Sequence, residues 1–306
     1  EAADEQILVE RYRNESRKIA LGLCDDEGSR KVAYHTLIKG YLDELRDLLE
    51  EEDPSERSVD NVVRKVEEYL ESCLQEYPGD SYLHSAESRL YELIDNQAKA
   101  FSALDKAFQA NPRNPFVAIR LSKIYEQQGD FEQACDTIKV ALRASPGNQR
   151  LRFRYAMLLL KDARSSIEER LYHLKRSFTE GDRQYESQFW YAVHCFLSGR
   201  TDVEETKRIF RHLRGCPVSF KTRMEIRYFL SEEGQTKFFR GTVGRKEGSF
   251  GFIDRDGFGD AIFVHMNNNK DIWNSLQVGS RVRFCVGFNF GGPTALEVKH
   301  EQNTVL

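Results

Sequence analysis

The stretch from Gly248 to His265, GSFGFIDRDGFGDAIFVH, decides the fold of the C-terminal part of the chain. It holds four phenylalanines and four glycines in eighteen residues. Successive side chains of a β-strand point to opposite faces of the sheet. Phe250 and Phe252 therefore share one face of a first expected strand. Phe263 and His265 share one face of a second.

The opposite faces of these two strands carry aliphatic side chains that are expected to fill a core: Ile253, Ile262 and Val264. The rings of Phe250, Phe252, Phe263 and His265 are then left outside, together and on adjacent strands. An unpaired base that stacks on an aromatic side chain gains about 1–3 kcal/mol. The pattern therefore predicts a platform for single-stranded nucleic acid.

The composition changes near Gly234, where helical periodicity gives way to alternation with frequent glycine. Five short strands are expected, near residues 237–244, 249–254, 260–266, 280–286 and 293–299. Five short strands in roughly 65 residues favour a small closed barrel. We expect this barrel to span residues 235–300, with a tail at 301–306.

The order of motifs in this region, RGTV…SFGFI…AIFVHM…GSRVRF…GGPTALEV, resembles the cold-shock domain. That family is an antiparallel barrel of the oligonucleotide-binding (OB) fold, and it binds single-stranded RNA and DNA. The resemblance covers residues 237–299, and its two ribonucleoprotein motifs correspond to 248–253 and 262–266. The segment GRKEGS lacks the tryptophan and phenylalanine that the family has there, and Met266 follows the histidine. The resemblance thus implies that one stacking position is missing.

Basic side chains are expected to surround the aromatic platform and to neutralise phosphates. They are Arg240, Arg245, Lys246, Lys270, Arg281 and Arg283. Three further phenylalanines are expected in loops, where they would compensate for the missing ring: Phe258, Phe288 and Phe290. We count Phe290 among the expected binding residues.

The N-terminal part of the chain contains a repeat. Pro78, Pro112 and Pro146 are spaced by 34 residues, and each follows an apolar periodic run. In the unit Asn114–Pro146 the apolar positions fit one face of each of two helices. Gly129 lies in the turn between them, and Asp130 is placed to cap the second helix. The sequence therefore predicts an array of helix pairs.

The best unit resembles the tetratricopeptide repeat (TPR). The matching positions are Leu121, Ser122, Tyr125, Gly129, Phe131, Ala134, Ala141 and Pro146. About five pairs are expected over residues 30–214, because a single repeat cannot bury its own apolar face. We expect an α-solenoid domain over 30–234, in which residues 218–233 form a capping helix and residues 48–58 an acidic loop. Residues 1–29 are expected to form a helix that continues from an upstream domain.

Charge is distributed unevenly along the chain. Residues 1–80 hold 11 Lys and Arg against 22 Asp and Glu, whereas residues 139–235 hold 19 against 12. The basic residues of the solenoid include a second candidate patch: Arg150, Arg152, Arg154, Lys207, Arg211 and Arg214. This patch is either a solvated face or an extension of the nucleic-acid track from the barrel. The concave face of the solenoid is suited equally to a peptide.

No catalytic motif is visible in the sequence. The six cysteines are scattered, form no CxxC motif and indicate reduced thiols in a cytoplasmic protein. No phosphate-binding loop, HExxH or GxSxG motif occurs. We therefore expect no cofactor, no metal and no membrane span, and we expect the chain not to be an enzyme.

The sequence thus predicts a multidomain α + β protein, a TPR-like solenoid followed by a five-stranded cold-shock barrel. The expected function is single-stranded RNA or DNA binding by the barrel, with a protein partner held by the solenoid. One alternative is the regulatory C-terminal region of a larger multidomain enzyme, such as an NTPase or a nuclease. Another is a protein scaffold whose degenerate barrel docks on the helices and covers Phe250 and Phe252.

Overall fold

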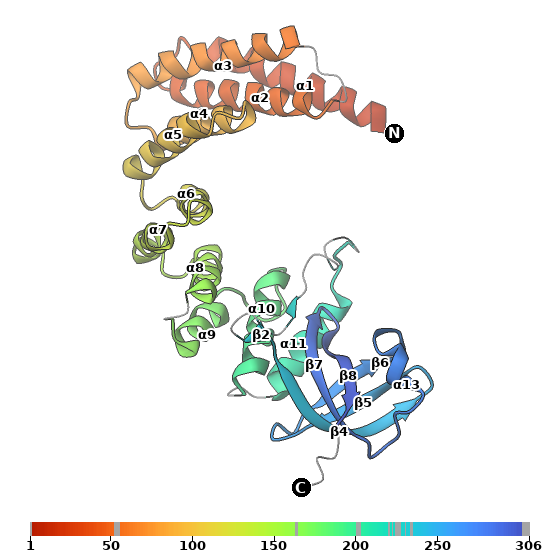
Figure 1. Ribbon diagram of the computed structural model, residues 1–306. Helices are drawn as coiled ribbons and strands as arrows, with labels where there is room; N and C mark the ends of the chain where they lie inside the picture. The colour runs from red at the N-terminus through yellow and green to blue at the C-terminus, as the bar shows by residue number, and fades with distance from the viewer. Residues whose placement is uncertain are drawn as a thin grey trace. The chain divides into compact units, whose positions relative to one another are not determined.

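The computed structural model describes residues 2–51, 56–162, 165–199, 203–219, 221, 223, 228–229, 231–232 and 235–301. The chain divides into two compact units, residues 1–158 and residues 159–306 (Figure 1). The second unit joins the last helices to the barrel. The domain limits that the sequence suggests, including the one at Gly234, stay predictions.

Helices make up the described part of the first unit. They are α1 (Ala2–Leu23), α2 (Arg30–Leu49), α3 (Glu56–Glu76), α4 (Ser81–Leu93), α5 (Gln97–Ala110), α6 (Pro115–Gln127), α7 (Phe131–Ala144) and α8 (Gln149–Lys161), which runs past the limit of the unit. The second unit continues with α9 (Ile167–Lys175), α10 (Tyr185–Ser198) and α11 (Val203–Gly215). The pairs α2/α3, α4/α5, α6/α7 and α10/α11 pack directly against each other.

The period of 34 residues predicted from the prolines is confirmed by the helix starts. α4, α6 and α8 begin at Ser81, Pro115 and Gln149, so equivalent helices start 34 residues apart. α5 and α7 begin at Gln97 and Phe131, with the same spacing. The array of TPR-like helix pairs therefore forms where the sequence placed it.

Capping residues repeat with the same period and fix where each helix begins. The side chains of Asp80 and Asn114 accept hydrogen bonds from the first free backbone N–H groups of α4 and α6, and that of Asn148 accepts one from the Leu151 N–H of α8. Such a cap contributes about 1 kcal/mol. The Asp130 side chain caps α7 in the same way, directly after Gly129, whose φ of 81° suits glycine. Both roles were predicted from the sequence.

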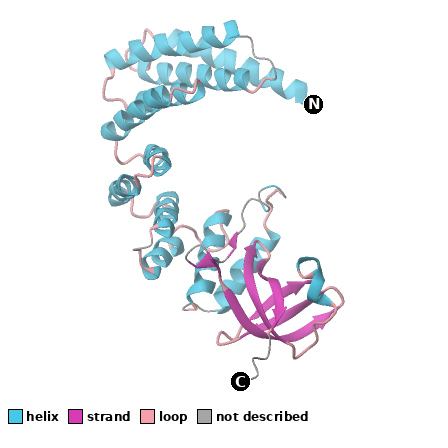
Figure 2. Cartoon of the chain, in the orientation of Figure 1, coloured by secondary structure: helices cyan, strands magenta, loops and turns pink. Residues whose placement is uncertain are grey.

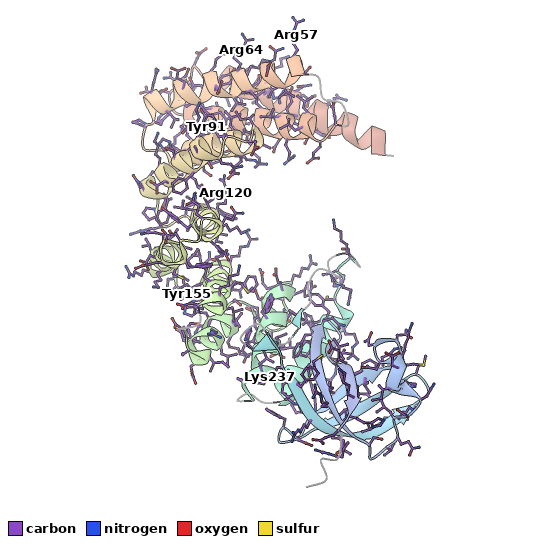
Figure 3. All side chains as sticks on the ribbon, in the orientation of Figure 1. Arg57, Arg64, Tyr91, Arg120, Tyr155 and Lys237 are labelled. Carbon is purple, nitrogen blue, oxygen red and sulfur yellow. The ribbon has the colours of Figure 1, made fainter. Side chains whose placement is uncertain are left out.

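An arginine on α6 links α6 to α4. The Arg120 guanidinium donates to Ser88 Oγ at 3.0 Å and to Glu92 Oε1 at 2.8 Å. Figure 3 labels Arg120 on this helix. The same arginine also donates to the hydroxyl and the carbonyl of Ser85. One side chain thus ties two successive repeats together.

The contact recurs one repeat later. Arg154 on α8 donates from Nε to Ser122 Oγ at 2.8 Å and pairs through Nη1 with Glu126 at 2.6 Å. Each of these three residues lies 34 positions after its counterpart in the preceding contact. The side chains of Arg154 and Glu126 are only 12% and 15% exposed. We call the two contacts together the arginine ladder. It was missed in the sequence, although the repeat period makes the equivalent arginine, serine and glutamate visible.

We predict that Arg154→Met destabilises the first unit by about 1.5–3 kcal/mol, because it removes charge-assisted hydrogen bonds from a mostly buried site. Urea unfolding of the full chain, followed by circular dichroism, measures the change. Arg143→Met is the matched control, since Arg143 is exposed on α7. Equal unfolding midpoints for the two variants would contradict a stabilising role for the ladder.

The end of the helical region differs from the sequence prediction. A capping helix was expected over residues 218–233, but two short strands occupy part of it, β1 (Tyr228–Phe229) and β2 (Ser231–Glu232). β1 pairs with a barrel strand, and β2 pairs with β3 (Gln235–Thr236). The prediction is therefore wrong for these four residues. Much of the remaining stretch, and residues 52–55 of the expected acidic loop, lie outside the described residues.

Five strands close the barrel, as predicted, and Figure 2 draws them in magenta. They are β4 (Phe238–Glu247), β5 (Phe250–Arg255), β6 (Ala261–His265), β7 (Arg281–Asn289) and β8 (Gly292–His300). The order β7-β4-β5-β6-β8 closes because β7 and β8 also pair, and β1 extends the same sheet beside β7. β6 and β8 run parallel, and the other pairs run antiparallel. A 3-10 turn and the short helix α13 (Lys270–Trp273) follow β6.

Candidate nucleic-acid interface

The barrel interior is aliphatic and leaves the aromatic side chains of β5 and β6 outside. Ile253 and Ile262 are 0% exposed and Val264 is 2% exposed. The rings on the opposite face are only partly buried. The barrel thus has the inward and outward faces that strand alternation predicted.

The outer rings form two cross-strand pairs. Phe250 lies opposite His265, and Phe252 lies opposite Phe263. The Phe250 and Phe263 rings stack with centroids 6.2 Å apart and an interplanar angle of 24°. The Phe252 ring meets the Phe263 ring edge-on at 5.8 Å, and the Phe263 and His265 centroids lie 6.1 Å apart. We call these four residues the aromatic platform.

Local contacts fix the shape of the platform. His265 Nδ1 accepts a hydrogen bond from the Asn267 N–H at 3.1 Å, which orients the imidazole. Gly251 lies between the two phenylalanines of β5 and faces the interior. A Cβ atom at this position would lie 2.5 Å from the Arg245 carbonyl oxygen. Only glycine therefore lets β4 approach β5 this closely.

The charged side chains beside the platform come from β4. Arg245 lies opposite Phe252, and Glu247 lies opposite Phe250. The two charges form an ion pair at the edge of the rings. The arginine was predicted, but the carboxylate beside it was not considered in the sequence. Its effect is to reduce the net charge next to Phe250.

Lys246 does not face the platform, although the sequence placed it among the phosphate ligands. Its Nζ donates to the carbonyl oxygens of Trp273 and Leu276, at 2.7 and 2.8 Å. Strand alternation explains the difference, because Lys246 pairs with the inward-facing Gly251. This lysine holds α13 and the turn after it against the barrel. Lys270, at the start of α13, is exposed.

Three predicted arginines lie on the side of the barrel formed by β4 and β7. Arg240 lies opposite Arg283, whose guanidinium is 4.5 Å from the Phe238 ring centroid. Arg281 pairs with Asp256 at 2.6 Å and with Glu301 at 3.3 Å, and Arg240 also pairs with Glu301. The hydrogen bond from Arg281 holds the pKa of the Asp256 carboxyl below its ordinary value. β4 thus separates Arg281 and Arg283 of β7 from the platform. Arg240 lies on β4 itself, where its carbonyl accepts from the Asp256 N–H beyond the end of β5.

The family comparison identifies the barrel. Residues 239–301 match the family model of the "'Cold-shock' DNA-binding domain". The barrel is a cold-shock domain. The matched segment holds all four platform residues and lies within the second unit.

Several solved structures resemble the chain, and two of them are described as TPR proteins. One is a thermophilic TPR protein of Thermus thermophilus, with 15% identity, a TM-score of 0.41, and coverage of 62% of this chain and 94% of that one. Another is YrrB, described as a TPR protein with an unusual peptide-binding site, with 12% identity, a TM-score of 0.44, and coverage of 64% and 93%. The pilF protein of Pseudomonas aeruginosa has 14% identity, a TM-score of 0.47, and coverage of 69% and 82%. No curated protein matches the sequence.

The cold-shock domain packs against α10 and α11 through rings that are not part of the platform. The Phe288 ring meets that of Phe196 at 5.1 Å and that of Phe210 at 6.3 Å. The Phe290 ring lies 5.8 Å from Phe189 and is 2% exposed. The prediction that Phe290 binds nucleic acid is therefore contradicted, because its ring is buried in this packing.

A buried ion pair completes the packing against α10. Arg255 and Asp260 form a bidentate pair at 3.0 and 2.7 Å, with side chains 3% and 9% exposed. The guanidinium lies 4.1 Å from the centroid of Phe196 on α10 and 3.6 Å from that of Phe258. Phe258 is thus occupied by the arginine, although it remains 41% exposed. The docking alternative proposed that Phe250 and Phe252 would be covered, but they stay partly exposed.

The second basic patch divides into two halves. Lys207, Arg211 and Arg214 of α11 line a hollow together with Phe252 and Phe263 of the platform. The other half lies in the first unit, where each of its three arginines contacts other residues of that unit. Arg150 lies over the Phe116 ring, Arg152 donates to the Pro146 carbonyl, and Arg154 belongs to the arginine ladder.

No helix among the described residues has the length and apolar character to cross a lipid bilayer. No group of three or more His, Cys, Asp or Glu side chains in the described ranges is placed to hold a metal ion. Burial raises the pKa of the Cys73 thiol to about 12 and also raises that of Cys285.

Proposed function

We propose that this chain binds single-stranded nucleic acid on the aromatic platform of its cold-shock domain. The observation that carries the proposal is the exposure of the platform. The domain packs on α10 and α11 through Phe288, Phe290 and Arg255, and this packing leaves Phe250, Phe252, Phe263 and His265 partly exposed. Flat rings in this arrangement offer stacking surfaces to successive unpaired bases.

Electrostatic attraction adds to stacking in this proposal. Arg245 lies beside Phe252, and Lys270, Arg211 and Arg214 are exposed. Each phosphate that a basic side chain neutralises releases counterions, so affinity falls with rising salt. The ion pair between Arg245 and Glu247 weakens this attraction at the Phe250 end of the platform. Most of the attraction therefore comes from the side of the platform that faces α11.

The helix pairs supply the second part of the proposal, a protein-binding solenoid. Helix-pair arrays stack into extended surfaces suited to peptides. The described helices of the first unit carry exposed apolar side chains, among them Phe116 at 62% and Phe131 at 43%. The proposed role of the chain is thus to bring a protein partner to a single strand.

The proposed function predicts salt-dependent binding of single strands. With about three phosphates neutralised, affinity for a fluorescent oligouridylate should fall roughly twentyfold between about 50 and about 200 mM salt. Fluorescence anisotropy with the full chain measures it. An oligothymidylate is titrated in parallel, because contacts with the 2′-hydroxyl decide between RNA and DNA. A duplex of equal length is the control, and equal affinity for duplex and single strand would contradict binding by base stacking.

A further inference from the structure

The hollow beside the platform has walls from two parts of the second unit. Its volume is about 530 Å³, which is within the usual range of small-molecule sites. Lys207, Arg211 and Arg214 of α11 line one side. Phe252 and Phe263 of the platform line the other, with Pro293 at the start of β8.

The two walls are held together by close contacts. The Phe210 ring of α11 stacks on Phe288 of β7 with an interplanar angle of 19°. A Cβ atom at Gly292 would lie 3.6 Å from the Phe210 ring. Arg214 Nη2 donates to the Gly291 carbonyl at 2.9 Å. α11 is thus fixed against the turn between β7 and β8, which also carries Pro293.

The hollow is positively charged. Four cationic side chains line it, Lys207, Arg211, Arg214 and Arg255, against one carboxylate, Asp260, so its net charge is +3. Arg255 and Asp260 neutralise each other in their buried pair. Within the described residues, Arg211 is exposed and forms no ion pair. Lys207 is also exposed, and it pairs with the exposed Glu204. The uncompensated charge therefore comes from α11.

The hollow continues the platform. Along β6, outward-facing residues succeed each other as His265, Phe263 and Ala261. Phe263 is both the centre of the platform and a wall of the hollow, and Ala261 lines the hollow next to it. A strand that stacks on His265 and Phe250 and then on Phe263 and Phe252 reaches the hollow with its next nucleotide.

We propose that this hollow is a nucleotide subsite in which α11 contributes phosphate ligands to the cold-shock domain. The base of the entering nucleotide packs against Phe252, Phe263 and Pro293. The flanking phosphates are bound by Lys207, Arg211 and Arg214. The inference rests on the proposed function and adds a composite site that requires α11 and the barrel together.

The test uses the full chain and two fluorescent oligouridylates, of about four and about eight nucleotides, within the range of site sizes of OB-fold proteins. Lys207→Ala/Arg211→Ala is expected to weaken binding of the longer oligonucleotide roughly tenfold at low salt. Its salt slope should decrease by about 1.4, since each lost phosphate contact to a single strand contributes about 0.7. The shorter oligonucleotide fits on the platform alone, so its affinity should change less than twofold.

Arg208→Ala is the matched control. Arg208 is a neighbouring cation of the same helix, pairs with Glu180 at 2.8 Å and does not line the hollow. It should leave both affinities unchanged. Equal effects of Arg208→Ala and the double variant would overturn the subsite, because they would reflect overall charge. If the double variant binds as the wild type does while platform variants lose binding, the subsite is wrong and the proposed function stands. Failure of the wild type to bind either oligonucleotide would overturn both.

A second measurement addresses the base. Two longer oligonucleotides, each abasic at one end, are titrated against the wild type. One of them should bind about tenfold more weakly, because its missing base no longer packs in the hollow. Unchanged affinity for both would show that α11 contacts phosphates without an adjoining base, which would overturn the nucleotide subsite.

Discussion

Replacing Phe250 and Phe263 together by alanine is expected to weaken single-strand binding by at least tenfold, and by about a hundredfold if each ring stacks one base. Stacking contributes about 1–3 kcal/mol per base, and 1.4 kcal/mol corresponds to a factor of ten. The two rings are stacked on each other at 6.2 Å and belong to adjacent strands. Their loss therefore removes the centre of the platform. Anisotropy titration at low salt measures the effect.

The control for this variant is Phe238→Ala. Phe238 is 37% exposed and lies on β4, where it packs under Arg283, away from the platform strands. It should leave the affinity within about twofold of the wild type. Thermal melts establish that each variant is folded. Wild-type affinity in a folded Phe250→Ala/Phe263→Ala variant would rule out the platform as the binding surface.

Asp260→Asn is expected to destabilise the second unit by about 3–5 kcal/mol. The carboxylate is 9% exposed and accepts two hydrogen bonds from Arg255, which is 3% exposed. Asparagine has nearly the same shape but leaves the guanidinium with an uncompensated charge in a buried site, which carries a penalty of this size. Chemical denaturation of the full chain, followed by tryptophan fluorescence, measures the change, because Trp190 and Trp273 both lie in the second unit. Trp273 is 4% exposed in the barrel and donates from Nε1 to the Gly248 carbonyl, so its environment changes on unfolding.

Asp256→Asn makes the same chemical change in an exposed ion pair. Asp256 accepts two hydrogen bonds from Arg281, and both side chains are 45% exposed. Water replaces the lost partner there, so the unfolding midpoint should change little. Similar midpoints for the two asparagine variants would contradict the importance of burial at Asp260.

Periodicity explains what could be predicted from the sequence. The 34-residue spacing located the helix pairs, and the alternation in GSFGFIDRDGFGDAIFVH separated Ile253 and Ile262 from Phe250, Phe252 and Phe263. The alternation arises within single strands, where neighbouring residues determine the face of a side chain. The period marks consecutive helix pairs, each of which is one local repeat unit. The cap at Asp130 and the turn at Gly129 also depend only on neighbouring residues, and both were predicted.

Contacts between elements explain what was missed. The burial of Phe290 depends on Phe189, which is far away in sequence. The position of Lys246 depends on carbonyl groups of α13 and the turn after it, and that of Arg154 depends on serine and glutamate of the preceding repeat. Strand alternation predicts the face of the sheet on which a side chain lies, but it does not predict which residues of other elements contact that side chain. For the same reason the α11 patch and the aromatic platform were predicted separately, and their meeting at one hollow was not.

The packing of Phe288 and Phe290 determines which segment of the chain can be produced or transferred as an independent domain. A fragment cut at the change in composition near Gly234 would carry the whole barrel but would expose two rings that are now 3% and 2% exposed. It would also leave one face of the Arg255 guanidinium without Phe196. Such a fragment should be prone to self-association. A fragment intended for recombination or engineering should therefore begin before α10, so that it contains the barrel together with α10 and α11.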